Sequence, residues 1–294
     1  MIPKGTLLII GGAEHKGDDN ELEMETKNLD FKQFEILKLL LKKKEKIEVI
    51  TTGSEIKQEV KKEYKQTFDK IGFNNTGFIP IEDKNEARLS KYIKRIEKAN
   101  TIFFSGGDQS RLSGILGGTP LIELILKRYF EDEDFVVAGT SAGAMVMSKI
   151  MISSGGANEP LLKNDIKISS GFGLLEHCII DTHFIKRGRF GRLAHAVIIN
   201  PGQLGIGLGE DTALIVKNGK DAECLGSGMV VLIDGTEIGQ TNIPDVEDEY
   251  GVFVENLKVH LMVKGCRFNL KTRMIANPAK NPKEKGRKVF NAQA

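Results

Sequence analysis

The chain has 294 residues, enough for one large α/β domain with a sizeable core. Its hydrophobic content of 40% and charged content of 28% are typical of a globular protein. A net charge of +2 gives no overall attraction to nucleic acid or to a membrane surface, so we expect neither as a partner.

The three cysteines, Cys178, Cys224 and Cys266, are an odd and widely spaced set. Such a set predicts neither a disulfide framework nor a zinc site, and it suits a reducing compartment. The first residues lack the apolar stretch and the cleavage site of a signal peptide. No apolar run approaches the roughly 20 residues that a membrane-spanning helix needs. We therefore expect a cytoplasmic protein that needs no metal ion and no other cofactor.

The first half of the chain alternates predicted strands and helices. Apolar, β-branched runs predict strands, and apolar residues at helical spacing predict amphipathic helices. Strands are expected at 6–10, 46–52, 76–81, 101–104 and 135–138, and helices at 31–44, 54–71, 85–98, 120–129 and 142–149. This order predicts an α/β fold with a mostly parallel, doubly wound sheet.

The pattern changes near residue 206, where short strands follow one another without long helices. They are expected at 207–208, 212–217, 222–225, 229–234 and 256–263, as extra C-terminal antiparallel strands at the end of the sheet. The sequence shows no linker, so residues 1–270 are expected to form a single α/β domain. Residues 271–294 carry seven Lys and Arg against one acidic residue and are expected to form a basic C-terminal tail.

Gly139-Thr140-Ser141-Ala142-Gly143 has the G-x-S-x-G form of a nucleophile elbow. An apolar strand leads into it and a helix-forming run leads out, which predicts the sharp turn that such an elbow requires. The turn demands small neighbours, and Gly139, Ala142 and Gly143 provide them. We predict that Ser141 is a nucleophile at a helix N-terminus, where free N–H groups favour a developing oxyanion. The alternative is a serine that caps an ordinary helix.

A serine nucleophile needs a base. Of the five histidines, His183 lies just past the apolar strand expected at 178–180, and ligands of a parallel sheet bind at that carboxyl edge. We predict that His183 is the base, with a structural histidine as the alternative. The carboxylate that orients its ring is expected to be Glu210, which follows another predicted strand, or otherwise its neighbour Asp211.

Ser105-Gly106-Gly107-Asp108-Gln109 is a second junction between a strand and a turn. Consecutive glycines allow a backbone to approach a ligand closely and to present N–H groups to it. We predict that the N–H of Gly107 or Asp108 joins that of Ala142 in an oxyanion hole, whereas the alternative is a simple tight turn. Gly11-Gly12 lacks the spacing of a dinucleotide motif, so no nucleotide is expected.

Three arginines, Arg187, Arg189 and Arg192, follow closely after His183. Guanidinium groups pair bidentately with carboxylates. At least one of the three is expected to bind a substrate carboxylate, and the others are expected to form structural ion pairs.

Together these motifs resemble the dipeptidase E-like serine peptidase family, to which the cyanophycinases belong. The order serine, histidine, glutamate differs from the serine, aspartate, histidine order of α/β-hydrolases and argues against an ordinary esterase. The resemblance extends over most of the chain, through residues 9–14, 105–109, 139–144, 181–184 and 207–213.

The resemblance implies a fold like the class I glutamine amidotransferase domain, with Ser141 as nucleophile, His183 as base and Glu210 as its partner. It also implies a homodimer that hydrolyses cyanophycin, a polyaspartate with arginine on each β-carboxyl, to β-Asp-Arg dipeptides. The residues implied to line the substrate groove are Gln109, Asp181, Thr182, Arg187, Arg189 and Arg192, with Asp181 facing a substrate guanidinium and Thr182 where the family pattern has glutamine. The rival predictions are an Asp-X dipeptidase of the same family and a non-catalytic binding module on the same fold.

Overall fold

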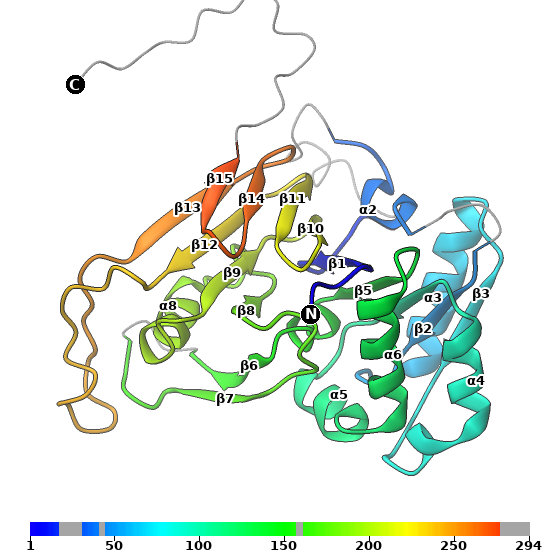
Figure 1. The fold of residues 1–294 in the computed structure, drawn as a ribbon, viewed down its shortest axis with the longest axis horizontal. Coiled ribbons are helices and arrows are strands. Elements are labelled where there is room, and N and C mark those ends of the chain that lie inside the picture. The colour runs from blue at the N-terminus through cyan, green and yellow to red at the C-terminus, as the bar shows by residue number, and fades with distance from the viewer. Residues whose placement is uncertain (18–30, 41–44, 157–160, 277–294) are drawn as a thin grey trace, which may run out of the picture.

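The computed structural model describes residues 1–17, 31–40, 45–156 and 161–276 (Figure 1). Two sheets dominate these residues. The larger has nine strands in the order β15-β14-β11-β10-β1-β5-β4-β2-β3, and the smaller has four in the order β13-β12-β9-β8. Within the described ranges, no helix has both the length and the apolar content that crossing a membrane requires.

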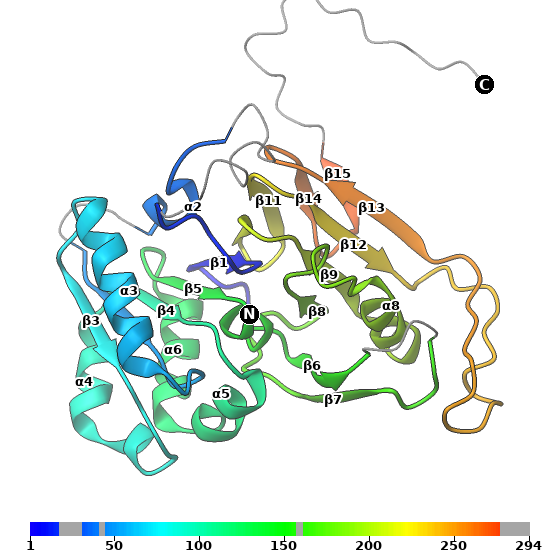
Figure 2. The same ribbon diagram turned by 180° about the vertical axis from the view of Figure 1, so that it is seen from behind.

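Five neighbouring strands of the larger sheet, β1, β5, β4, β2 and β3, run parallel, as the first half of the sequence predicts. The elements of this half are β1 (Thr6–Ile10), α2 (Glu35–Lys38), β2 (Ile47–Ile50), α3 (Lys57–Lys70), β3 (Thr76–Ile79), η1 (Glu86–Arg88), α4 (Ser90–Lys98), β4 (Thr101–Phe104), α5 (Gln109–Leu116), α6 (Pro120–Glu131), β5 (Val136–Thr140) and α7 (Ala142–Met145). A parallel sheet must be covered on both faces. Leu8 and Ile10 share a core with α2 and α3, whereas Leu7 and Ile9 share one with α4 and α6 on the opposite face (Figure 2).

The other end of the larger sheet is antiparallel. β10 (Thr212–Lys217) pairs with β1, and β11 (Asp221–Gly226), β14 (Arg267–Asn269) and β15 (Met274–Ala276) continue outward. The predicted α/β class, with a parallel sheet and added antiparallel strands, is thus confirmed. β15 lies inside the segment 271–294 for which the composition predicts a basic tail. Residues 277–294 of that segment lie outside the described part of the chain.

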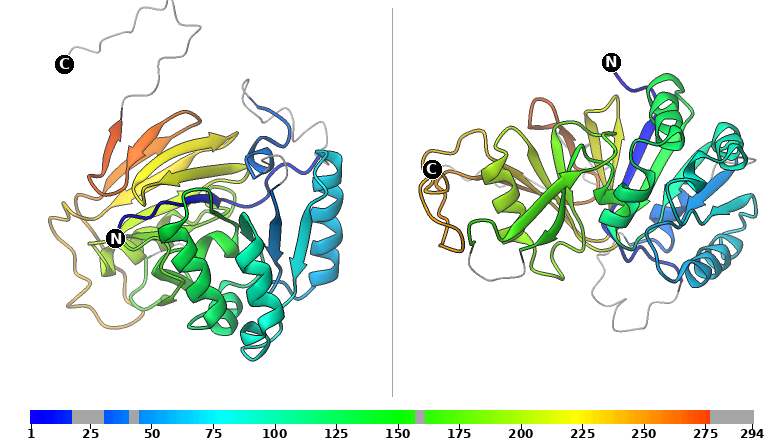
Figure 3. Two further views of the ribbon diagram at one scale, coloured as in Figure 1. Left: turned by 45° about the vertical axis from the view of Figure 1, so that its right-hand side comes forward. Right: turned by 90° about the horizontal axis from the view of Figure 1, so that it is seen from below.

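The smaller sheet lies beside the larger one and carries its own helix (Figure 3). It consists of β8 (Cys178–Asp181), β9 (Leu204–Leu208), β12 (Val230–Asp234) and β13 (Lys258–Met262). β8 and β9 are parallel, and α8 (Phe190–Ile199), which joins them, packs on one face. The prediction that the strands at 207–208, 229–234 and 256–263 extend a single sheet is therefore wrong. Apolar alternation identifies a strand but not its neighbour in space.

Two predicted helices are shorter than expected. α2 begins only at Glu35 because Phe34 has the left-handed φ of 58°, and residues 41–44 of the predicted helix lie outside the described part of the chain. α7 ends at Met145, and four residues later the Lys149 N–H donates to the Leu175 carbonyl at 2.9 Å. The chain continues into β6 (Ile150–Gly155), which pairs with β7 (Ile166–Ser170). Neither of these strands nor α5 is predicted by the periodicity.

Candidate active site

Ser141, His183 and Glu210 meet where the carboxyl ends of the two sheets come together. Ser141 follows β5 of the larger sheet, whereas His183 and Glu210 follow β8 and β9 of the smaller one. His183 Nε2 lies 3.1 Å from Ser141 Oγ, and His183 Nδ1 lies 2.6 Å from Glu210 Oε1. The three predicted residues therefore form one hydrogen-bonded chain in the structure. They come from two sheets, whereas the sequence predicts them at the edge of a single sheet.

Asp211, the alternative partner for His183, is engaged elsewhere. One of its carboxylate oxygens accepts from the His15 N–H at 3.0 Å, and the other accepts from the Ser227 hydroxyl at 2.5 Å. Glu210 is thus the carboxylate that lies against the histidine ring.

The end of β1 holds all three loops through consecutive backbone carbonyl groups. Each carbonyl accepts an N–H from a different loop: Ser141 donates to Ile10 at 3.1 Å, His183 donates to Gly11 at 2.8 Å and Asp211 donates to Gly12 at 2.9 Å. Ser141, His183 and Asp211 lie more than 120 positions after β1 in the sequence, so this short segment brings together loops that are distant along the chain. Nothing in the sequence indicates which loops this segment holds.

Gly11 and Gly12 have no room for a side chain. A Cβ on Gly11 would lie 1.9 Å from the carbonyl oxygen of Gly209, and one on Gly12 would lie 2.4 Å from His183 Nε2. Gly12 also has a φ of 97°, a conformation that glycine adopts without strain. The signal in the sequence was a pair of glycines directly after a buried strand, which marks a close approach of backbone to another group.

The backbone at Ser141 is strained in the way that a nucleophile elbow requires. Its φ of 53° and ψ of −119° are rare for a residue with a side chain. Small neighbours permit the turn, because a Cβ on Gly139 would lie 2.3 Å from the Gly143 carbonyl oxygen and one on Gly143 would lie 2.2 Å from the Phe104 carbonyl oxygen. Backbone oxygens therefore occupy the space that a side chain at either position would need. This explains why the turn requires glycine on both sides of Ser141.

The backbone around Ser141 offers two N–H groups for an oxyanion. Among the described residues, the N–H groups of Gly107 and Ala142 have no acceptor, and Gly107 lines the same cavity as Ser141. Asp108 is different, because its N–H donates to the Gly53 carbonyl at 2.9 Å and its carboxylate accepts from the Arg111 N–H at the start of α5. The Asp108 N–H is therefore engaged in the fold, and Gly107 remains the predicted second donor.

The neighbours of Glu210 keep its carboxylate ionised. Burial acts to raise the pKa of Glu210, but hydrogen bonds from His183 and Lys186 and the charge of Lys186 outweigh it, so the pKa lies below its ordinary value. Lys186 Nζ lies 3.0 Å from Oε2, which leaves Oε1 to His183. An ionised Glu210 favours the ring tautomer with the proton on Nδ1, and Nε2 can then accept from Ser141.

Asp181 is fully buried and holds two of the three arginines. Arg192 contacts both of its carboxylate oxygens, at 2.5 and 2.6 Å, and Arg189 donates to one of them at 3.1 Å. The Asp181 side chain is 0% exposed, so a substrate guanidinium does not reach it. The predicted substrate contact at Asp181 is corrected: its carboxylate fixes the segment between β8 and α8.

The other residues predicted to line the groove differ in accessibility. Thr182 is buried, and its N–H donates to Asp181. The Gln109 side-chain amide donates to the carbonyls of Ile152 and Ser153, which attaches β6 to the start of α5. Arg187 is exposed and has no ion pair within the described residues, so it is the arginine of the three that can meet a ligand.

Within the described ranges, no group of three or more His, Cys, Asp or Glu side chains is arranged to hold a metal ion. All three cysteines are free thiols. Burial raises the pKa of Cys178 and of Cys224 to about 12, so neither is a reactive thiolate at neutral pH.

Comparison with known proteins identifies the family. The model for peptidase family S51 matches residues 7–223, about three quarters of the chain. The chain belongs to this family. Family S51 members are serine-type peptidases, and the chain is therefore an enzyme of that type.

Curated relatives and a solved structure agree with this assignment. The cyanophycinase of Trichormus variabilis is 33% identical over 276 residues, which cover 92% of this chain and 88% of that protein. The cyanophycinase of Geminocystis herdmanii is 32% identical over 269 residues, with 92% and 95% coverage. The crystal structure of a peptidase from an acI-B1 Actinobacterium superposes on this S51 chain with a TM-score of 0.62 at 22% sequence identity. The superposition covers 92% of this chain and 97% of that peptidase, which shows a shared fold.

We predict that Gly143→Ala lowers the free energy of unfolding by about 3 kcal/mol, because the new Cβ meets a backbone oxygen that cannot move aside. Gly114→Ala is the matched control, since a Cβ there has nothing within 4 Å. This change within α5 should stabilise the protein by roughly 0.5–1 kcal/mol. Urea denaturation measures both, and an unchanged midpoint for Gly143→Ala would contradict the packing argument.

We also predict that Lys186→Met raises the pKa of Glu210, because the variant loses one of the two hydrogen bonds and the charge that lower it. The ionised carboxylate stabilises the fold above its unfolded pKa, and this contribution is lost as the pH falls through the folded pKa. As the pH falls, the variant should therefore begin to lose the stabilisation from the ionised Glu210 at a higher pH than the wild type does. NMR titration of the Glu210 carboxyl carbon measures the shift, with the exposed Lys84→Met as control. Equal titration of all three proteins would rule out the assigned cause.

Proposed function

We propose that this S51 peptidase hydrolyses cyanophycin to β-Asp-Arg dipeptides through an acyl-enzyme formed on Ser141. The observation that carries the proposal is the hydrogen-bonded chain from Ser141 through His183 to Glu210, at 3.1 and 2.6 Å. Relatives that align with 92% of this chain bear the name cyanophycinase, which supports the substrate.

In the first half of the reaction, His183 Nε2 takes the proton of the Ser141 hydroxyl as the oxygen attacks the aspartyl carbonyl. Glu210 stabilises the resulting imidazolium through Nδ1, and it remains ionised throughout. The carbonyl oxygen becomes an oxyanion that accepts from the N–H groups of Gly107 and Ala142. The Ala142 donor is held in place by the glycine-flanked elbow to which it belongs.

Collapse of the tetrahedral intermediate breaks the peptide C–N bond, and the imidazolium of His183 gives its proton to the leaving amine. Water then enters on the same side, loses a proton to Nε2 and attacks the ester carbonyl. The second collapse breaks the bond to Ser141 Oγ, and His183 returns the proton to the serine. Both halves use the same base and the same two donors. The proton that leaves with the amine in the first half is replaced by a proton from water in the second.

The resemblance to the family also leads us to propose that the enzyme acts as a homodimer in the cytoplasm. Size-exclusion chromatography with light scattering measures the oligomeric state. Fractionation of cells that express the protein measures its location. A monomer at micromolar concentration would contradict the proposed dimer without affecting the proposed chemistry.

Ser141→Ala should lower kcat for cyanophycin by a factor on the order of 10⁴ or more, because the nucleophile is lost while the fold remains. Incubation of the purified polymer followed by mass analysis for β-Asp-Arg measures the product. Ser90→Ala, at the exposed start of α4, is the control for the change of residue type. Wild-type turnover by Ser141→Ala would refute the mechanism. Faster release from Asp-Leu than from the polymer would favour the Asp-X dipeptidase.

Arg187 and Arg192 should respond differently to truncation. Arg187→Ala should raise KM for cyanophycin several-fold and change the free energy of unfolding by less than about 0.5 kcal/mol, because Arg187 is exposed. Arg192→Ala should lower the free energy of unfolding by about 3 kcal/mol, because it leaves the buried Asp181 with one arginine. Steady-state kinetics and urea denaturation separate the two effects. An unchanged KM in Arg187→Ala would remove that residue from the substrate groove.

A further inference from the structure

Asp211 is a buried carboxylate that the proposed mechanism does not use. It directly follows Glu210, it is 4% exposed, and its φ of 47° is rare for a residue with a side chain. A buried carboxylate destabilises a fold unless hydrogen bonds satisfy it. The groups that donate to Asp211 therefore decide where the loop that carries Glu210 can lie.

The connection between β11 and β12, residues 227–229, lies against this loop. The Ser227 N–H donates to the Asp211 carbonyl at 2.8 Å, and the Ser227 hydroxyl donates to the Asp211 carboxylate at 2.5 Å. The approach is close, because a Cβ on Gly226 would lie 2.1 Å from the Asp211 carbonyl oxygen. Since β11 belongs to the larger sheet and β12 to the smaller one, the chain crosses between the sheets at the point where it holds the Glu210 loop.

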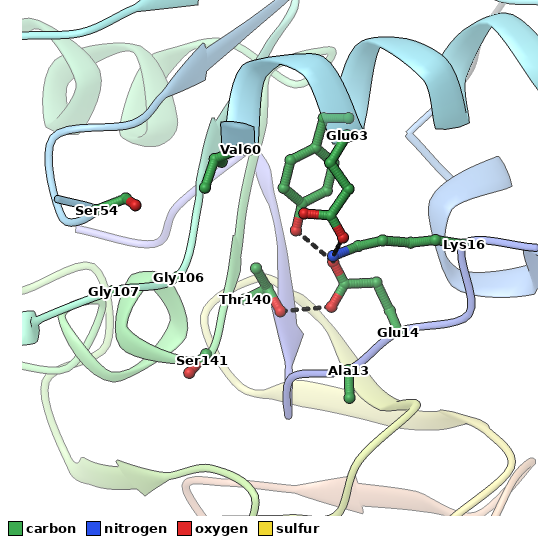
Figure 4. A pocket seen from close by; sticks show the side chains of 11 residues that line it. Ala13, Glu14, Lys16, Ser54, Val60, Glu63, Gly106, Gly107, Thr140 and Ser141 are labelled. Atoms are coloured by element: carbon green, nitrogen blue, oxygen red, sulfur yellow. Dashed lines mark hydrogen bonds and ion pairs between the residues drawn. The ribbon is translucent and has the colours of Figure 1, made fainter. Parts of the chain in front are cut away.

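The other carboxylate oxygen of Asp211 ties the loop to the segment that follows β1. This oxygen accepts from the His15 N–H at 3.0 Å. The residue before His15 is Glu14, whose carboxylate accepts from the Thr140 hydroxyl at 2.6 Å, and Thr140 directly precedes Ser141 (Figure 4). The two successive residues Glu14 and His15 thus link the neighbour of the nucleophile to Asp211.

These contacts close a ring around the candidate active site. On one side the ring runs from Ser141 through His183 to Glu210, at 3.1 and 2.6 Å. On the other side it returns from Asp211 through residues 14–15 to the strand that carries the serine. The second side sets the separation of Ser141 and Glu210 without the imidazole, so His183 meets a carboxylate whose place is already fixed. Groups that are fixed in advance need no rearrangement when charge develops in the transition state.

We propose that Asp211 and Ser227 are positioning residues, which hold Glu210 in line with His183 Nδ1. Their effect on rate rests on the hydrolysis proposed above. Loss of the Ser227 hydroxyl removes a hydrogen bond from a buried carboxylate and weakens the hold on a backbone that has a positive φ. The loop then relaxes, and Glu210 moves out of line with the imidazole. Such a misplacement slows the proton transfers without weakening substrate binding.

Ser227→Ala and Asp211→Asn test this role through the kinetics of cyanophycin hydrolysis. We expect each variant to lower kcat by about tenfold or more and to change KM by less than about twofold, because an interaction that acts on the transition state alone affects kcat. Ser227→Thr keeps the hydroxyl and should return kcat to within about threefold of the wild type. Ser90→Ala, at the exposed start of α4, is the matched control and should keep the wild-type values.

A second measurement does not depend on the substrate. Burial raises the pKa of Glu210, but the hydrogen bonds from His183 and Lys186 lower it by more. A Glu210 that has moved away from His183 should therefore titrate at a higher pH. NMR titration of the Glu210 carboxyl carbon in Ser227→Ala should show this rise, whereas a change that only destabilises the fold leaves the titration of the folded protein unchanged.

The outcomes separate the positioning role from the proposed function. A wild type that releases no β-Asp-Arg overturns the proposed function, and the NMR titration then decides the position of Glu210 by itself. A Ser227→Ala variant with wild-type kcat, or with an unchanged Glu210 titration, overturns the positioning role and leaves hydrolysis at Ser141 in place. A higher KM at unchanged kcat also overturns it, since the residue would then act on substrate binding. If Asp211→Asn does not fold, Ser227→Ala and its rescue by Ser227→Thr decide alone.

Discussion

Three successive carbonyl groups at the end of β1 hold the candidate active site together. Ile10, Gly11 and Gly12 each accept one N–H from a different loop, and those loops carry the serine, the histidine and the glutamate. A backbone hydrogen bond fixes the position of a loop more tightly than a side-chain contact does, because it leaves no rotamer to change. The 3.1 and 2.6 Å contacts among the three side chains are therefore a consequence of where β1 ends.

This arrangement makes strict demands on the residues around it. Ser141, His183 and Asp211, the three donors to β1, all have positive φ values, of 53°, 50° and 47°. Each such residue costs about 1–3 kcal/mol, and its conformation persists only where the surroundings enforce it. The buried strands leading to them enforce it, and glycines at positions 11, 12, 139 and 143 leave the space in which the loops can approach. The strain is concentrated at the reacting groups, while the parallel sheet around them is regular.

The sequence allowed much of the site to be predicted, for a physical reason. Ser141, His183 and Glu210 each follow an apolar strand, and strand ends are visible in a linear pattern. The separation into two sheets was not visible, because it depends on which strands pair across long distances. The same limit explains Asp108 and Asp181. Their residue types suit a ligand site, but the partner of the Asp108 N–H and the two arginines on Asp181 are known only once the chain is folded.

The charged groups around Ser141 are divided by side, and burial decides which of them can act. Near His183, the fully buried Asp181 pairs with both Arg189 and Arg192 and holds them in place, whereas Arg187 is exposed and has no ion pair within the described residues. On the other side of Ser141, the buried Glu14 accepts from the hydroxyl groups of Tyr64 and Thr140, and Lys16 Nζ lies 3.8 Å from one of its oxygens. Among the described residues, burial thus separates the charges that fix the loops, those of Asp181 and Glu14, from a charge that stays accessible to a ligand, that of Arg187.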